Sequence, residues 1–332
     1  MNSFRIVINN FKRSYNKKIS FIVNFVIPIV VVILGIFANN ASQPSFIIGV
    51  IDGEHSSDIV NTLSHTDGIT IGVANPHTIK IDLITGIFSA VVSFSNSSYE
   101  LFSIKDEKTN EDLKQIIDSC KTPPPVNIEG IIGVEMSIAE RTIAFIVLFL
   151  MVTATVTASI MIKDKNNGTL KRYKYSPQKP INYIAGNFIY NYLITFLQFF
   201  ISVTFIQLLR IDMGISYWNL MLTGIWLSGI ATAFGTFFSS IFQKEMHANL
   251  FAAFTALILS LVGGTFIAFD KMPAMLQNIS VVSPLRWFIE VTKNMENGID
   301  WFENTEQVVI LSVMIFVLLT AASLINKNQN KS

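Results

Sequence analysis

The residues whose types could do chemistry gather in one short segment, residues 163–179. This segment holds six basic residues against a single acid, Asp164. Leu170 and Tyr173 stand three residues apart, so a short helix would place them together on one apolar face, with Arg172 beside them. Such a helix is suited to docking a soluble partner protein. The same pattern also fits a basic loop with no partner, and the residues leave both interpretations open.

Other kinds of chemistry find no support in the sequence. No glycine is followed directly by lysine, so the phosphate-binding pattern G-x-x-x-x-G-K-[ST] is absent. The histidines His55, His65 and His77 lack the spacing that would place two of them on one helical face. Cys120 is the single cysteine, and a small buried side chain is favoured over a reactive thiol. The sequence therefore predicts no catalytic residue, metal site or cofactor in this chain.

Long apolar segments dominate the rest of the sequence. Six segments of 20 or more residues contain no Asp, Glu, Lys or Arg. About 20 apolar residues in a helix cross the hydrocarbon core of a bilayer. Charged residues make up 14% of the chain, whereas a soluble protein carries about a quarter. The sequence therefore predicts a polytopic α-helical membrane protein with six transmembrane helices, at residues 19–38, 138–162, 181–209, 217–242, 247–268 and 304–326.

The distribution of basic residues predicts which segments face the cytoplasm. Residues 1–18 hold five basic residues and no acid, with apolar residues at helical spacing. They predict either an amphipathic helix at the lipid headgroups or an ordinary basic flank. Because Lys and Arg near span ends resist translocation, residues 1–18, the segment 163–180 and the tail 327–332 are predicted to be cytoplasmic. Residues 39–137 and an external hairpin at 269–303 then lie on the opposite side.

Strand-like and helix-like runs alternate within residues 39–137. Four strands are predicted, at Phe46–Ile51, Ile69–Val73, Ile87–Phe94 and Tyr99–Lys105. Three helices are predicted, at Ser56–Ser64, Pro76–Thr85 and Asn110–Cys120. Alternation of this kind is typical of a mixed sheet with helices packed against it. We therefore expect an extracytoplasmic α/β domain inserted between the first and second transmembrane helices.

Neutral polar side chains recur along the second and third predicted spans. Thr153 and Thr157 share one helical face, and Asn187 and Asn191 share another, with Gln198 further along. These side chains are candidates to line a substrate pathway, and they equally fit a role in joining helices to one another. The span interiors hold no fixed charge, which argues against a secondary carrier driven by an ion gradient. Energy for transport would then come from outside the chain.

Three ordered motifs give the chain a resemblance to a known family. The first comprises Asp164, Gly168, Thr169, Leu170, Arg172, Pro177 and Gly186. The second precedes the last span and comprises Pro273, Pro284 and Trp287. The third is Phe11–Pro28, a basic amphipathic entry with a proline inside the first span. Together they resemble the ABC-2 type (ABCG-like) permeases of ABC transporters over nearly the whole chain. Lys165-Asn166-Asn167 departs from the family pattern, which is often rich in Glu and Arg at that place.

The resemblance implies a type V, ABC-2 exporter-like fold and a set of partners. Two copies of an ABC ATP-binding subunit would bind ATP and magnesium, while this chain holds no cofactor. The residues implied to couple the chain to that subunit are Asp164, Gly168, Thr169, Leu170, Arg172, Tyr173 and Pro177. A second permease, identical or homologous, and membrane lipid are the other expected partners, and nucleic acid is not one.

The resemblance also implies a class of cargo and a location. The expected protein is a multi-pass permease of the bacterial plasma membrane with both termini in the cytoplasm. Its relatives export antibiotics or toxins or confer self-immunity, so an amphipathic cargo is expected, such as an antibiotic, a peptide toxin or a lipid-like compound. Two alternatives stay open. One is a sodium-export permease of the same family, and the other is a non-transporting membrane sensor whose external domain binds a ligand.

Overall fold

The apolar segments of the chain fold as long helices. The structure is a computed structural model that describes residues 3–42, 46–51, 69–85, 87–88, 90–95, 98–103, 110–111, 114, 136–176, 180–269 and 272–328. The chain divides into two units. One contains residues 1–40 and 136–332, and the other contains residues 41–135. Each unit is described by itself.

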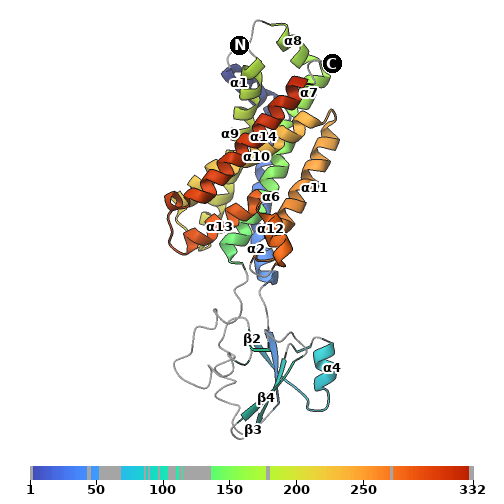
Figure 1. Cartoon of the computed structure of the whole chain (residues 1–332), viewed down its shortest axis with the longest axis vertical. Coiled ribbons are helices and arrows are strands. Elements are labelled where there is room, and N and C mark those ends of the chain that lie inside the picture. Colours follow the sequence, from blue (N-terminus) through green and yellow to red (C-terminus); the bar gives the residue numbers. More distant parts are fainter. Residues whose placement is uncertain are drawn as a thin grey trace. The chain divides into compact units, whose positions relative to one another are not determined.

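The first unit is helical, and its elements are drawn in Figure 1. Its first half comprises α1 (Ser3–Tyr15), α2 (Lys18–Ser42), α6 (Ile138–Ala158), α7 (Ile160–Asn166), α8 (Thr169–Lys174) and α9 (Pro180–Leu208). Its second half comprises α10 (Tyr217–Ile241), α11 (Glu245–Gly263), α12 (Ala274–Ser280), α13 (Pro284–Glu296), the 3₁₀ turn η3 (Trp301–Glu303) and α14 (Thr305–Asn328). Helices α1, α7 and α8 lie at one end of this unit, and α12 and α13 lie toward the other (Figure 1).

Among the described residues of this unit, six helices are long and apolar enough to cross a membrane. They are α2, the combined helix α6–α7, α9, α10, α11 and α14. This count agrees with the six transmembrane helices predicted from the sequence. The second of them runs on to Asn166, past residue 162 where the predicted span ends, because only Ser159 separates α6 from α7 and its N–H still donates to the carbonyl of Thr155 at 3.0 Å.

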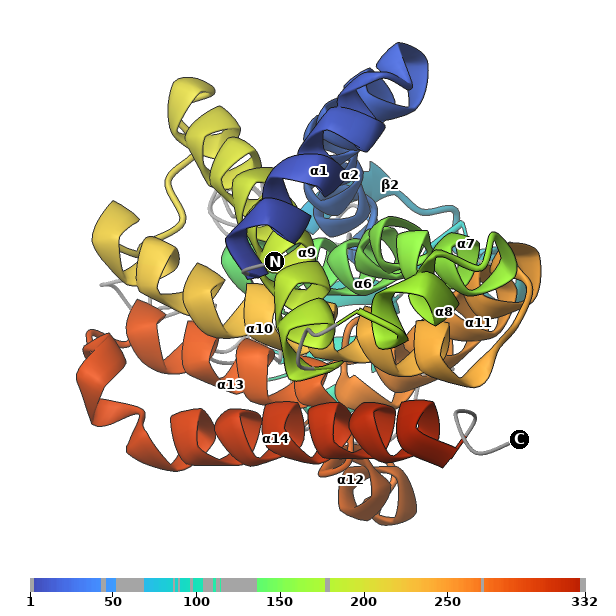
Figure 2. The same cartoon turned by 90° about the horizontal axis from the view of Figure 1, so that it is seen from above.

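Helices α6 and α10 form the core of the unit. In the most apolar stretch of α6, 78% of the residues are buried within the protein, whereas in that of α14 only 11% are buried. Figure 2 shows α10 between α14 on one side and α6 on the other. Close approach of α6 and α10 requires Gly235, because a Cβ there would lie 2.6 Å from the backbone carbon of Ala154. In each of the outer helices α2, α11 and α14, less than a third of the apolar stretch is buried within the protein, as in helices that face lipid.

The second unit contains a four-stranded sheet with the strand order β2-β1-β3-β4. The strands are β1 (Phe46–Ile51), β2 (Ile69–Val73), β3 (Ala90–Ser95) and β4 (Ser98–Phe102), and the helix α4 spans Ile79–Ile84. Strand β1 pairs in parallel with β2 and β3, whereas β3 and β4 form an antiparallel hairpin. The sheet is therefore mixed, and the extracytoplasmic placement of this unit as an α/β domain stays a prediction.

A glycine pair makes room for an aromatic ring over this sheet. Gly49 of β1 lies opposite Gly72 of β2 in the register. A Cβ at Gly72 would lie 2.7 Å from Cε1 of Phe88, and one at Gly49 would lie 3.0 Å from its Cγ. The predicted strand at Ile87–Phe94 accordingly begins only at Ala90, after Phe88 has packed over the glycines. The predicted helix Ser56–Ser64 and most of Asn110–Cys120 lie outside the described residues.

Candidate functional site

The segment predicted to dock a partner folds as a helix–turn–helix. Helix α7 ends at Asn166, and Gly168 follows with a left-handed φ of 66°, which a glycine adopts without a steric penalty. Helix α8 then begins at Thr169. The predicted helix around Leu170 and Tyr173 is therefore present, and it is joined to the membrane-spanning helix α6–α7 by one tight turn.

Asp164 of α7 links three helices. Its carboxylate lies 2.8 Å from Nη1 of Arg13 on α1 and accepts a hydrogen bond of 3.0 Å from the hydroxyl of Tyr183 on α9. The Asp164 side chain is only 5% exposed, so its charge must be balanced inside the protein. Because three elements meet at one buried carboxylate, α1, α7 and α9 are held in a fixed mutual arrangement. We call Arg13, Asp164 and Tyr183 the carboxylate hub.

The neighbours of Asp164 bind two further helices. Lys163 forms an ion pair of 2.8 Å with Glu245 at the start of α11. Lys165 donates to the carbonyls of Ser239 and Ser240 at 3.3 and 3.2 Å, near the carboxyl end of α10. A cation is favoured there because the last carbonyls of a helix carry partial negative charge. Three consecutive positions of α7 thus reach different helices, and Asn166 donates to the carbonyl of Gln243 in the turn between α10 and α11.

Helix α8 turns its apolar face inward. Leu170 and Tyr173 pack against a cluster formed by Ile6, Ile160, Met161 and Tyr183. The rings of Tyr173 and Tyr183 lie 5.4 Å apart, and partial burial raises the pKa of Tyr173 above its ordinary value.

The outward surface of α8 is therefore basic and aromatic. Lys171 and Arg172 are exposed, and Tyr175 just after the helix is 83% exposed. A partner protein meeting α8 would contact these residues, with Leu170 and Tyr173 beneath them. Pro177, the last residue of the predicted coupling motif, lies outside the described residues.

The five candidate pathway residues are all buried in this chain and all hydrogen bonded. Thr153 donates to Gln198 at 3.1 Å, and Gln198 donates to a backbone carbonyl of α2 at 2.9 Å. Asn191 donates to a carbonyl of α6 at 3.1 Å. Asn187 accepts from Asn10 of α1 at 2.9 Å. These bonds join helices to one another, which is one of the two roles that the sequence left open.

Thr157 differs from the other four candidates. Its hydroxyl donates to the carbonyl of Thr153 within the same helix, at 3.0 Å. It also lines a cavity of about 160 Å³ near the α7 end of the unit. A role of the five residues in lining a pathway stays a prediction.

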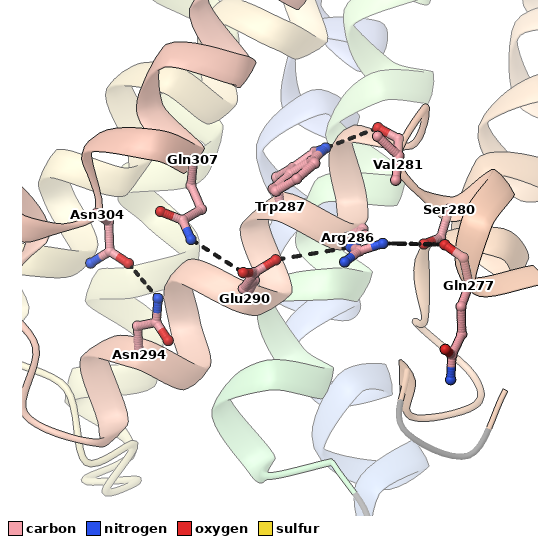
Figure 3. Close-up of polar contacts among 9 residues, drawn as sticks. All are labelled: Gln277, Ser280, Val281, Arg286, Trp287, Glu290, Asn294, Asn304 and Gln307. Atoms are coloured by element: carbon pink, nitrogen blue, oxygen red, sulfur yellow. Dashed lines mark hydrogen bonds and ion pairs between the residues drawn. The ribbon is translucent and has the colours of Figure 1, made fainter. Parts of the chain in front are cut away.

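The predicted external hairpin forms α12 and α13, and Figure 3 shows its polar contacts. Pro284 occupies the first position of α13, where its missing N–H has no helical partner to lose. Pro273 precedes α12 in the N-cap position. The indole N–H of Trp287 donates to the carbonyl of Val281 at 3.0 Å, which closes the turn between the two helices.

A row of polar contacts connects α13 to α12 on one side and to α14 on the other (Figure 3). Arg286 donates to the hydroxyl of Ser280 at 2.8 Å, and its Nε lies 3.9 Å from the carboxylate of Glu290. Glu290 accepts in turn from Gln307 of α14 at 3.2 Å. Sequence analysis did not predict this row of contacts, although Arg286 and Glu290 stand at the i, i+4 spacing of a helical ion pair.

The side chains that could bind a metal ion are histidine, cysteine, aspartate and glutamate. Among the described residues, no three His, Cys, Asp or Glu side chains lie close enough to hold a metal ion. His77 is described and exposed, while His55, His65 and Cys120 lie outside the described residues.

Six apolar helices and a buried, mostly uncharged interior define a multi-pass membrane protein. The chain belongs to the family described as "ABC-2 family transporter protein", which matches residues 18–324. No curated protein matches the chain. The resemblance to ABC-2 permeases inferred from the motifs is thereby confirmed. Membership makes the chain a membrane component of an ABC transporter and implies association with an ABC ATP-binding subunit.

Proposed function

We propose that this chain is the permease subunit of an ATP-driven exporter that moves an amphipathic compound out of a bacterial cell. The cargo class comprises antibiotics, peptide toxins and lipid-like compounds. The observation that carries the proposal is the chemistry of the spans: their interiors contain no fixed charge in a protein of the ABC-2 family. A small ion crossing these spans would find few groups to replace its water, whereas an amphipathic molecule needs only apolar and neutral polar contacts.

The proposed orientation places the α7–α8 end in the cytoplasm of the cell. The basic residues of α1, α7 and α8 gather at this end, and Lys and Arg favour the cytoplasmic side. Helices α12 and α13 then face outward, as does the unit of residues 41–135, because it follows the first span. Two ATP-binding subunits and a second permease, identical or homologous, complete the proposed transporter.

The proposed route of coupling runs from α8 through the carboxylate hub. An ATP-binding subunit would contact Lys171, Arg172 and Tyr175 on the outward surface of α8. Leu170 and Tyr173 would pass the movement to α1 and α9, because they pack on side chains of both helices. Asp164 would keep these helices together during the movement, since breaking a buried charge pair is costly. Helices α1, α7, α8 and the start of α9 therefore move as one body in this scheme.

Reconstituted vesicles containing the chain and its ATP-binding subunit test the proposal. We expect amphipathic compounds to stimulate ATP hydrolysis and to accumulate on the side opposite α8. The matched variants are the double charge reversal Lys171→Glu and Arg172→Glu on α8, and Lys12→Glu on the exposed face of α1 as a control. The α8 variant should lose stimulation, and the control should keep it. ATP-dependent sodium flux without stimulation by any amphipathic compound would overturn the proposal in favour of the sodium-export alternative.

A further inference from the structure

The cavity of about 160 Å³ beside the carboxylate hub has no role in the coupling scheme. Side chains of α1, α2, α6, α7, α9 and α11 line it, so it lies where the ends of several membrane-spanning helices meet. Its volume exceeds what a single water molecule needs. The cavity also lies at the end of the unit where α1 meets α7, a depth at which lipid headgroups are found if α6 and α11 cross the bilayer.

Positive charge exceeds negative charge around this cavity. Its lining contains Arg13, Lys17 and Lys163, but only one acid, Glu245. Arg13 and Lys163 have carboxylate partners in Asp164 and Glu245.

Lys17 is different from the other two cations. Among the described residues, no carboxylate lies within ion-pair distance of Lys17. Its pKa is lowered chiefly because the positive charge of Lys163 lies nearby. Three cations and the two carboxylates that pair with them leave an excess of one positive charge, and a bound monoanion would balance it.

A polar group without a partner faces the same cavity. The Oδ1 atom of Asn249 on α11 is buried and has no hydrogen-bond partner among the described residues. A buried amide oxygen left unpaired costs free energy, so a donor is expected there. Phe21 and Val156 supply an apolar wall, and Val156 is 42% exposed on the surface of α6. A ligand that complements this lining would carry an anionic group, a hydroxyl or ammonium group that donates to Asn249, and an apolar part that contacts the apolar wall.

We propose that this cavity binds the phosphodiester headgroup of an anionic phospholipid. The phosphate lies against Lys17 and Lys163, and a hydroxyl of a polyol headgroup donates to Asn249. The acyl chains extend over the exposed apolar side chains of α2 and α11, which include Ile22, Val26, Leu250 and Phe254. The proposal depends on membrane placement and not on the identity of the exported cargo. A lipid held there would bridge α1 and α11, two helices that the carboxylate hub does not join directly.

Lipid retention by the purified chain, measured by native mass spectrometry in detergent, tests the proposal. Without a bilayer there is no membrane surface potential, so retention reports a defined site. Phosphatidylglycerol should be retained in preference to phosphatidylcholine. Lys17→Gln should weaken retention of phosphatidylglycerol about fivefold, because the phosphate loses one partly exposed ion pair. Asn249→Leu should also weaken retention of phosphatidylglycerol. It should reduce the selectivity for lipids with a polyol headgroup, because the acceptor of the headgroup hydroxyl is lost.

The adjacent Lys18→Gln variant is the matched control. Lys18 carries the same charge and is exposed, but it does not line the cavity. Its retention of phosphatidylglycerol should equal that of the unmodified chain. Equal losses in the Lys17 and Lys18 variants, or equal retention of both lipids, would overturn the proposal.

Competition identifies the source of the phosphate. If the acyl chains contribute, neither inorganic phosphate nor glycerol 3-phosphate at millimolar concentration displaces the lipid. If either ion displaces the lipid from the unmodified chain but does not bind the Lys17→Gln variant, the cavity is a phosphate site for a soluble anion, and the assignment to a lipid is overturned. Because the ATP-binding subunit is not needed, failure here leaves the proposed export function untouched.

Discussion

The two ends of the helical unit hold their helices together by different means. At the α7 end, formal charges do so: the buried Asp164 pairs with Arg13, and Lys163 and Lys165 reach α11 and α10. At the α13 end, close backbone packing is joined by hydrogen bonds between one charged and one neutral side chain, such as those of Arg286 to Ser280 and of Ser137 to Glu296. An ion pair there joins Arg286 to Glu290 at 3.9 Å, with the carboxylate 37% exposed. The comparison shows where the protein places interactions that are costly to break.

This difference matches the proposed division of labour. Buried ion pairs contribute more to a fixed arrangement than to stability, because desolvation offsets much of their attraction. An end that transmits force from a partner needs its helices held in one arrangement. An end that closes the outer side of a transporter needs tight packing. Each of the following predictions alters one end and leaves the other unchanged.

The largest effect is expected from Arg13→Gln at the α7 end. The substitution leaves the buried Asp164 carboxylate without its cation, and removing one partner of a buried pair costs about 3 kcal/mol. Thermal unfolding of the detergent-solubilised chain should register the loss. Adding Asp164→Asn should recover part of it, because the unpaired charge is removed. If the loss of stability in the double variant equals the sum of the losses in the two single variants, Arg13 and Asp164 do not interact.

A smaller effect is expected from Gly263→Ala at the α13 end. A Cβ at Gly263 would lie 2.5 Å from Oγ of Ser283 and 3.1 Å from the backbone nitrogen of Arg286, so α11 and α13 must separate. Overpacking of this kind costs about 1–3 kcal/mol. The control is Gly229→Ala, where the new Cβ meets the flexible end of Ile315. Equal unfolding temperatures for the two variants would show that close packing does not hold this end.

The smallest effect concerns pH and Glu296, at the end of α13. Burial raises the pKa of this carboxyl above its ordinary value of 4.5, although a hydrogen bond from Ser137 opposes the shift. The folded chain therefore binds the proton more tightly than the unfolded chain does. Its contribution to stability is fully present below pH 4.5 and is lost as pH rises through the folded pKa. Glu296→Gln should flatten the dependence of unfolding on pH in this window, and an unchanged profile would contradict the assignment.

The sequence predicted the architecture well, because its strongest signals are long and local. Uncharged segments of 20 residues predicted six helices, and runs of β-branched residues predicted the strands β1 and β2 with their observed bounds. The face of α8 was harder to predict. Spacing placed Leu170 and Tyr173 on one apolar side but could not show whether that side meets a partner or the rest of the chain.

Long-range pairs lay beyond the reach of sequence analysis. Arg13 and Asp164 stand 151 positions apart in the sequence, and no local pattern links a basic residue of an amphipathic helix to one particular acid. The same holds for Lys163 and Glu245. A weak signal did exist: Asp164 is the single acid in a strongly basic segment, which indicates a specific partner for that carboxylate.

The most direct test of the account measures transport and ATP hydrolysis in the same vesicles. The comparison is between the unmodified chain and the double variant Arg13→Gln and Asp164→Asn, each assembled with the ATP-binding subunit. The cargo is the amphipathic compound that stimulates ATP hydrolysis most. If the carboxylate hub carries movement from α8 to α1 and α9, the variant continues to hydrolyse ATP but exports far less compound per ATP. An unchanged ratio of export to hydrolysis would contradict the account.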